Sequence, residues 1–367
     1  MELANPSRED AAVNLTVQEI SGAIGDSATV LPVVVAVAVL TELSLSVMLL
    51  WFGFFQVVWG LYYGVPISVE PMKALAALVI AGAVSAGEVV VAGLLLAVML
   101  TTLGATRTLE AVERHVGDWV VRGIQVGVGL VLLETGIGLA GDGPVLALVA
   151  GVVFIGVALA RSRTLSVFAV FLLGAGIAVT EMGLPTPTLP PVETLLVFSA
   201  EFTAQSVEAT LAQLAVTVGN AAMATSVLLG DYFDRDISAD QLSTSMGAMN
   251  ALAVPLGGFP MCHGSGGVAG KYAFGARTAG ANIVLGVGYI FLALLAVGLV
   301  TAYPTAVLGV ILILVALQLA WTGVCESDAV VLAGAVGLLS VFVGLGTAFL
   351  AGIGVYKLGQ ILNRRVN

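Results

Sequence analysis

The stretch that decides the fold reads GGFPMCHGSGGVAGKYAFGARTAGAN and covers residues 257–282. Its first part, Phe259–Cys262, is predicted to be extended, and a helix is predicted to begin near Ser265. The glycines allow a ligand or another helix to approach the backbone closely. The helical part, 265–276, is too short to cross a membrane, because a transmembrane helix needs about 20 apolar residues. The stretch therefore predicts a half-helix preceded by a short extended segment.

A second break of the same kind lies earlier in the chain, in GVPISVEPMKALAA at 64–77. Alternating apolar residues over 65–69 predict an extended stretch. Pro71 suits the first turn of a helix, where its missing N–H is harmless, and the half-helix is expected at 71–83. Extended backbone at membrane depth is tolerated only where it lines a cavity or is buried in protein, so the two breaks mark a candidate site.

The composition identifies a membrane protein with many spans. Of 367 residues, 59% are hydrophobic and 10% are charged, and the mean hydropathy is +1.08, whereas a soluble domain carries about 25% charged residues. Two cysteines, Cys262 and Cys325, cannot form a disulfide framework. Residues 1–21 are polar and acidic, so we expect no cleavable signal peptide.

The charge balance is acidic, with 23 acidic and 13 basic residues and a net charge of −10. Such a surface repels nucleic acid and anionic lipid, so no nucleic-acid partner is expected. A halophilic host would fit, because a salty interior screens added charge. The alternative is that the acidic composition arose by drift and has no function.

The apolar runs predict an all-α polytopic membrane protein with fourteen transmembrane segments. The segments are expected at 27–41, 43–63, 71–83, 86–103, 118–139, 144–160, 164–179, 206–230, 241–257, 265–276, 279–301, 304–321, 327–344 and 346–362. With both termini cytoplasmic, fourteen crossings place Arg107 and Lys357 on the cytoplasmic side. The link 180–205, which has no Lys or Arg, then falls outside the cell. We therefore expect a multi-pass protein of the plasma membrane.

The two halves of the sequence resemble each other. A shift of 194 positions aligns Gly25 with Gly219 and Pro66 with Pro260, and Asp26 then meets Asn220. The same shift joins a helix opening to a Pro-containing break in each half. Since each half has an odd number of segments, the two repeats must lie in opposite orientations across the bilayer. Inverted repeats with interrupted segments at matching positions are typical of secondary transporters, with the binding site between the breaks.

The chemistry of the two breaks favours a doubly charged oxyanion as the ligand. Each half-helix offers unpaired N–H donors and about half a positive charge at its N-terminus. Together with the Lys73 ammonium group, two facing half-helices supply about two positive charges. The donors are directional, which suits an oxyanion better than a halide.

Two motifs of soluble proteins almost appear in the second break. GSGGVAGKY departs from the P-loop at Ser265 and at Tyr272, and the dinucleotide fingerprint from Gly264 lacks a surrounding βαβ unit. The chain also lacks an HExxH motif, a Gly-x-Ser-x-Gly elbow and a cluster of metal ligands. We expect no enzyme activity, cofactor, catalytic residue or metal.

At these residues the sequence resembles the molybdate transporter family, within the broader sulfate permease superfamily. The matching stretches are GDSATVLP (25–32), GVPISVEPMKALAA (64–77), VVRGIQVGVGL (120–130) and the stretch at 257–282. The resemblance implies a seven-plus-seven inverted-repeat fold, similar to uracil and bicarbonate permeases. It also implies uptake of molybdate, a tetrahedral dianion, with sulfate as the close competitor.

The resemblance further implies two domains that each draw on both repeats. A core domain, 1–103 and 206–302, carries the substrate on segments 1–4 and 8–11. A gate domain, 104–205 and 303–367, supports it with segments 5–7 and 12–14, and 104–205 includes the external linker.

One residue departs from the family pattern, because Glu70 replaces an expected glutamine in VEPMK. A carboxylate beside a bound dianion costs several kcal/mol at low effective dielectric unless it is neutralised. Our hypothesis is that Glu70 binds a proton together with the anion, or forms a gating pair with Lys73.

The residues expected to contact the substrate are Asp26, Ser27, Thr29, Glu70, Pro71, Met72, Lys73, Asn220, Cys262, His263, Gly264, Ser265 and Gly266. Asp26 and Asn220 either cap helices or face the cavity, where Asp26 would couple an ion or a proton. His263 either donates to the oxyanion or packs between helices. Gln125 and Gln318 are expected to bridge helices, with a ligand role as the alternative. Interface or cytoplasmic-rim charges are expected at Arg122, Arg277 and Lys271.

The sequence thus predicts a secondary active transporter, a symporter of molybdate with a proton or sodium ion. The alternatives are a sulfate, bicarbonate or nucleobase permease, a membrane-embedded enzyme and an anion sensor. The partners are the anion, the coupling ion and the lipid bilayer, and the sequence leaves a homodimer open.

Overall fold

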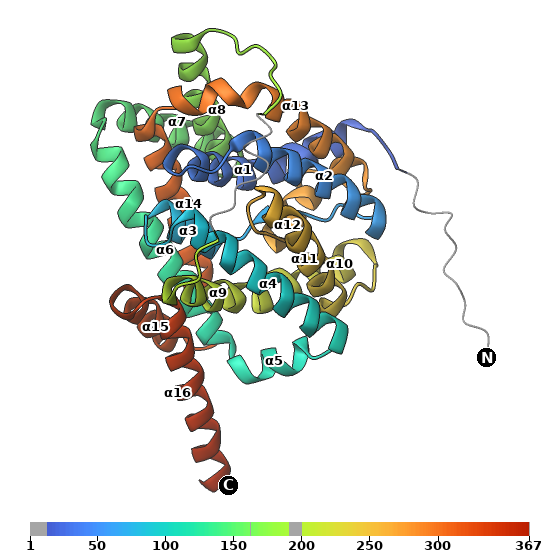
Figure 1. The fold of residues 1–367 in the computed structure, drawn as a ribbon, viewed down its shortest axis with the longest axis vertical. Coiled ribbons are helices and arrows are strands. Elements are labelled where there is room, and N and C mark those ends of the chain that lie inside the picture. Colours follow the sequence, from blue (N-terminus) through green and yellow to red (C-terminus); the bar gives the residue numbers. More distant parts are fainter. Residues whose placement is uncertain (1–12, 162, 191–199, 367) are drawn as a thin grey trace, which may run out of the picture.

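The computed structural model describes residues 13–161, 163–190 and 200–366, and it is almost entirely helical (Figure 1). Most of the acidic N-terminal segment and part of the link 180–205 lie outside the described residues. The helices are α1 (Val17–Leu40), α2 (Leu45–Tyr63), α3 (Lys73–Ile80), α4 (Ala86–Thr106), α5 (Leu109–Val116), α6 (Asp118–Gly141), α7 (Pro144–Ala160), α8 (Arg163–Met182), α9 (Ala204–Val216), α10 (Thr225–Phe233), α11 (Ala239–Ala253), α12 (Ser265–Ala273), α13 (Gly280–Ala302), α14 (Thr305–Cys325), α15 (Val330–Val343) and α16 (Leu345–Val366). Within the described residues, eight helices are long and apolar enough to cross a membrane.

Two short strands connect the two halves of the chain. Strand β1 (Glu70–Pro71) pairs antiparallel with β2 (Met261–Cys262), so that Glu70 lies opposite Cys262. The Asn250 side chain accepts from the Met261 N–H (2.7 Å) and donates to the Met261 carbonyl (2.7 Å). The Asn250 amide thus gives hydrogen-bond partners to both backbone groups of Met261, which lies outside the helices. The second predicted stretch, Phe259–Cys262, contains β2, whereas β1 lies directly after the first predicted stretch, 65–69.

Each strand leads directly into a short helix, α3 and α12, and because the strands are antiparallel the two half-helices run away from the strand pair on opposite sides (Figure 1). The Met72 N–H at the start of α3 donates to the Pro260 carbonyl (2.9 Å) and extends the strand pairing. Both half-helices lie deep in the protein, and the α3 residues 74–77 are all buried. The predicted starts of the half-helices are confirmed to within a few residues.

The first helix begins earlier than the sequence predicts, at Val17 instead of residue 27. The polar first turns are helical because their polar groups have partners inside the protein. Thr16 caps the helix, and the buried Glu19 carboxylate accepts from the N–H groups of Thr278 and Ala281 at the start of α13. The prediction that Asp26 might cap this helix is wrong, because Asp26 lies in the middle of α1.

Helices α9 and α10 form one long helix through a π-helical segment, Thr217–Ala224. Asn220 lies in this segment, so its predicted role as an N-cap is also wrong. π-Helical insertions occur frequently at functional sites. One helix, α5, was not predicted: LEAVERHV is too rich in charge to register as an apolar span.

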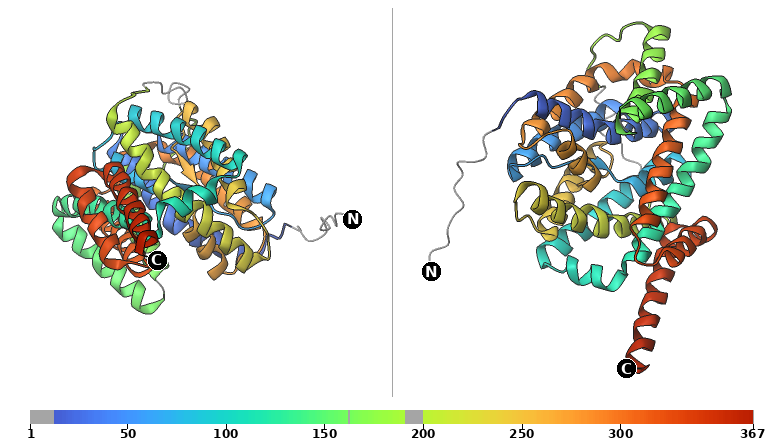
Figure 2. Two further views of the ribbon diagram at one scale, coloured as in Figure 1. Left: turned by 90° about the horizontal axis from the view of Figure 1, so that it is seen from below. Right: turned by 180° about the vertical axis from the view of Figure 1, so that it is seen from behind.

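Close helix packing depends on glycine where backbones touch. A Cβ atom on Gly53 of α2 would lie 2.6 Å from the Gly286 carbonyl oxygen of α13, which is too close for any side chain. Small residues of this kind let membrane helices approach each other. Helices α6 and α14 pack along their length, and the last turns of α16 project away from the body (Figure 2).

Candidate functional site

The Glu70 carboxylate occupies the N-terminus of half-helix α12. Its Oε1 atom accepts a hydrogen bond from the Gly267 N–H (2.7 Å), and its Oε2 atom lies 2.7 Å from the Lys73 ammonium nitrogen. Glu70 is buried, whereas the Lys73 side chain is 22% exposed. A carboxylate is well placed at a helix N-terminus, because free N–H groups and the helix dipole favour negative charge there.

Gly264 makes this approach of Glu70 possible. A Cβ atom at Gly264 would overlap the Glu70 carboxylate, so only glycine fits. Gly266, two residues later, is exposed and has open space where a Cβ atom would be. The tip of α12 is therefore closed by Glu70 on one side and open on the other.

The N-terminus of α3 is capped by a residue that the sequence analysis missed. The Gln213 Oε1 atom of α9 accepts from the N–H groups of Ala74 (2.9 Å) and Leu75 (3.3 Å). Its Nε2 atom donates to Thr217 Oγ1 (2.9 Å). A lone glutamine inside the apolar segment 206–230 was the available signal.

Asn220 connects the π-helical segment to the tip of α12. Its Oδ1 atom accepts from the Ser265 hydroxyl group (2.7 Å), and both residues are half-buried. Asn220 also lines a cavity of about 40 Å³ between the π-helical segment and α6. Arg122 lines the same cavity and forms ion pairs with Asp118 (3.2 Å) and Glu326 (2.8 Å).

A second buried ion pair lies behind the first. The Lys271 ammonium nitrogen is 3.0 Å from Asp26 Oδ2, and both side chains are fully buried. The prediction that Lys271 carries an interface or rim charge is therefore wrong. Its partner is a carboxylate far away in the sequence, and only tertiary packing reveals it.

The Ser68 hydroxyl group joins the two ion pairs. Its Oγ atom lies 2.7 Å from Asp26 Oδ1 and 3.3 Å from Glu70 Oε1. The buried chain therefore runs from Lys73 through Glu70, Ser68 and Asp26 to Lys271. Its two carboxylates and two ammonium groups balance in charge, as buried charges generally require.

The His263 ring packs between helices, which is the second of its two predicted roles. Its Nε2 atom is 2.7 Å from Ser245 Oγ, and its Nδ1 atom is 3.0 Å from the Ser68 carbonyl oxygen. The ring is fully buried and contacts Trp59 and Tyr63 edge-on. Both ring nitrogens are thus occupied by protein groups.

The remaining candidate residues hold backbone positions or bond within their own helix. The Ser27 hydroxyl donates to the Ala23 carbonyl, and the half-buried Thr29 hydroxyl donates to the Asp26 carbonyl (both 2.9 Å). Three further candidates are buried at the strands: Pro71, Met72 and Cys262.

Arg277 is exposed and Gln125 is buried. The Arg277 guanidinium carbon lies 3.8 Å from the Tyr272 ring centroid. Gln125 accepts from Arg122 (3.3 Å), whereas Gln318 is exposed. Neither glutamine reaches the half-helix tips through a hydrogen bond within the described residues.

The arrangement matches known transporters in sequence and in fold. A family model described as "Molybdate transporter of MFS superfamily" matches residues 18–132 and 205–319. Molybdate transporters 2 and 1 of Arabidopsis thaliana are each 28% identical over 82% of this chain and 78% of their own length. Molybdate transporter 1 of Chlamydomonas reinhardtii is 33% identical over 34% of this chain and 25% of its length.

Two solved structures share the fold. The transmembrane domain of the cyanobacterial bicarbonate transporter BicA has a TM-score of 0.67 at 18% identity, covering 91% of this chain and 97% of that domain. The murine anion transporter Slc26a9 has a TM-score of 0.69 at 15% identity, covering 95% of this chain and 69% of its own. The two matched ranges of the family model contain the residues of both ion pairs and both half-helices and make up most of the chain. The chain therefore belongs to the molybdate transporter family.

Proposed function

We propose that this protein is a secondary active transporter of molybdate and that the anion binds at the N-terminus of α12 beside Lys73. One observation carries the proposal: the Glu70 carboxylate accepts from Gly267 N–H and pairs with Lys73. A carboxylate and an oxyanion make the same demands on their surroundings, namely N–H donors and a positive charge. Glu70 thus stands where an oxygen of the substrate would bind.

Glu70 makes anion binding depend on a proton. Two negative groups a few ångströms apart repel each other by several kcal/mol at low dielectric. A proton on Glu70 removes this repulsion and releases both the Gly267 N–H and the Lys73 ammonium group for the substrate. The proposed cycle is therefore symport, in which one proton enters on Glu70 with each dianion.

The proposed binding site comprises the accessible groups around the α12 tip. Gly266 would offer its N–H group. The Ser265 hydroxyl group, which donates to Asn220 Oδ1 in the structure, would have to rotate away from Asn220 to donate to the anion. Gly264 contributes by leaving room for the carboxylate. Asp26 acts from behind through Ser68, because it is fully buried.

The proposed architecture has fourteen segments in two inverted repeats. The antiparallel pairing of β1 with β2 supports it, because equivalent segments of inverted repeats run in opposite directions. The core domain would contain α1–α4 and α9–α13, and the gate domain α6–α8 and α14–α16. All four charges of the buried chain then move together with the core during alternating access.

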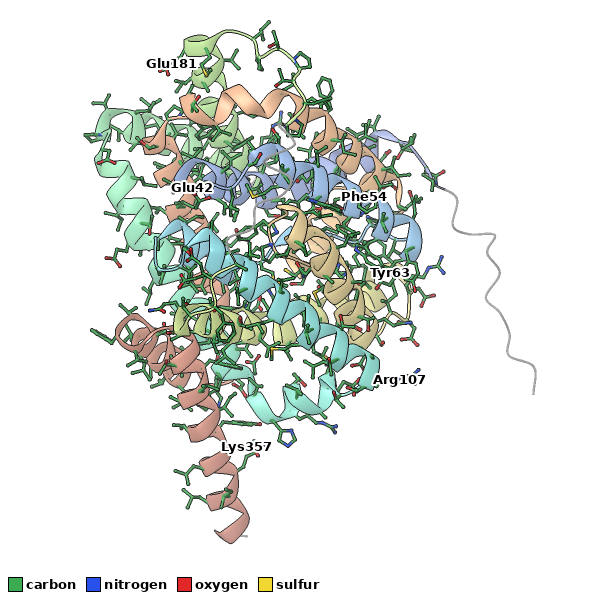
Figure 3. The ribbon with its side chains drawn as sticks, in the orientation of Figure 1. Glu42, Phe54, Tyr63, Arg107, Glu181 and Lys357 are labelled. Carbon is green, nitrogen blue, oxygen red and sulfur yellow. The ribbon has the colours of Figure 1, made fainter. Side chains whose placement is uncertain are left out.

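The proposed orientation has both termini in the cytoplasm and the chain in the plasma membrane. Figure 3 shows Arg107 and Lys357 toward one side of the molecule and Glu42 and Glu181 toward the opposite side. The positive-inside rule counts Lys and Arg near the ends of the spans, so the shared side of Arg107 and Lys357 supports this orientation. The side with Arg107 and Lys357 would face the cytoplasm.

Uptake of radiolabelled molybdate into proteoliposomes tests the proposal. The wild type should accumulate molybdate when an inward proton gradient is imposed, and Lys73→Ala should lose at least about tenfold of this uptake, because it leaves a buried carboxylate unpaired. Lys357→Ala on α16 is the matched control and should transport normally. Absence of uptake by the wild type would overturn the proposal, and full competition by equimolar sulfate would reassign the substrate to the alternative, sulfate.

A further inference from the structure

The Lys271 ammonium group lies in a closed cage of oxygen atoms. Its Nζ atom is 3.0 Å from Asp26 Oδ2, 3.0 Å from Gln56 Oε1 and 3.2 Å from Asn282 Oδ1, and it also donates to the Ile67 carbonyl oxygen. These oxygens come from α1, α2, α13 and the extended stretch before β1. All of the side chains involved are fully buried.

The cage has the ligand set of a small monovalent cation. Hard cations take carboxylate, amide and backbone carbonyl oxygens, and coupling ions in secondary transporters bind to carbonyls of unwound backbone beside half-helices. Ile67 lies in such an unwound stretch. One carboxylate and three neutral oxygens balance one positive charge.

We propose that Lys271 is a tethered cation: its ammonium group permanently fills this cation site, so that uptake needs no sodium ion. This inference rests on the proposed transport function and selects the proton over sodium as the coupling ion. The amide of Asn282 supports the assignment, because its Nδ2 atom donates to Gln56 Oε1 (2.8 Å) and thereby turns both amide oxygens toward Lys271.

The tethered cation also explains how Asp26 can lie near an anion site. Asp26 is bonded to Ser68, which in turn contacts Glu70. Without a permanent counter-charge, Asp26 would add a second negative charge behind the bound dianion. A mobile cation could supply the charge only while it remained bound, whereas Lys271 supplies it throughout the cycle.

Removing the ammonium group should turn the cage into a binding site for free cations. Thermal unfolding of purified Lys271→Ala is measured in choline chloride and in increasing sodium, lithium or ammonium chloride at constant ionic strength. The melting temperature should rise with the small cation, as it does for a ligand that binds only the folded state. The wild type and the control Lys357→Ala should show no such cation-specific rise.

A double variant distinguishes cation binding at Asp26 from a general stabilising effect of salt. Asp26→Asn combined with Lys271→Ala removes both charges and should not respond to small cations. An equal response of the single and double variants would overturn the proposal. The proposal would also be overturned if Lys271→Ala folded but its melting temperature responded to no cation. The same holds if Lys271→Ala failed to fold in every salt while the double variant folded.

Molybdate uptake by the wild type tests directly whether transport is independent of sodium. Replacing sodium by choline on both sides of the proteoliposome membrane should leave molybdate uptake unchanged, and a loss of about tenfold would overturn the tethered cation regardless of how the variants fold. If the wild type takes up no molybdate in any salt, the proposed function fails. The thermal measurement would still decide whether Lys271 fills a cation site.

Discussion

The Glu70 carboxylate and the Gly267 N–H are 2.7 Å apart, although 197 positions separate them in the sequence. The contact joins the extended stretch of the first break to the first turn of the second half-helix. It gives the positive end of α12 an anionic partner that belongs to the protein itself. Two of the predictions below, those for Glu70→Gln and for Gly264→Ala, depend directly on this contact.

Glu70→Gln should abolish the pH dependence of molybdate uptake. In the wild type, uptake should rise as the external pH falls, because a proton binds to Glu70 together with the anion. A glutamine amide cannot take up a proton and carries no charge that repels the dianion, so the variant should transport equally over the same pH range. Uptake is measured in proteoliposomes at a fixed membrane potential.

Glu110→Gln, on the exposed side of α5, is the matched control and should keep the wild-type pH profile. If Glu70→Gln retained the full pH dependence, the proton would have to bind elsewhere and the role assigned to Glu70 would be rejected.

Gly264→Ala should destabilise the protein, whereas Gly266→Ala should not. The new methyl group at Gly264 overlaps the Glu70 carboxylate, while that at Gly266 enters open space. Overpacking of this kind costs about 1–3 kcal/mol, which thermal unfolding in detergent would detect. Equal melting temperatures for the two variants would mean that Glu70 does not lie against the α12 tip.

Gln213→Leu should lower the stability of the folded protein by about 1–3 kcal/mol, because it leaves the buried N–H groups of Ala74 and Leu75 without an acceptor. Gln213→Glu keeps an acceptor oxygen in the same place and should lose less. Chemical unfolding of both variants measures the difference, and a leucine variant as stable as the wild type would exclude Gln213 as the cap of α3.

Introduced cysteines should report the orientation of the chain. In a Cys325→Ser background, which removes the exposed native thiol, Glu181→Cys should react with a membrane-impermeant maleimide on intact cells. Lys357→Cys should react only after the cells are permeabilised. The reverse labelling pattern would place the termini outside the cell.

The two interruptions of the helices could be predicted from the sequence, because the signals for them lie within a few neighbouring residues. Proline and glycine at the two breaks exclude continuous helix there, and the short apolar runs that follow exclude full spans. The half-helices and the extended segment that contains Met261 and Cys262 were predictable in this way. The N-terminal end of α1 was not predicted, because hydropathy cannot show that the Glu19 carboxylate accepts hydrogen bonds from backbone N–H groups at the start of α13.

The sequence by itself determined that the chain crosses a membrane many times and is interrupted twice, since hydrophobic length and backbone restrictions act over a few neighbouring residues. Only the tertiary structure decided which groups meet at the interruptions: Gln213 at α3, Glu70 at α12, and Asp26 with Lys271. These partners lie on segments far apart in the chain, and burial forces each charge or free N–H group to find a partner wherever the packing of helices supplies one.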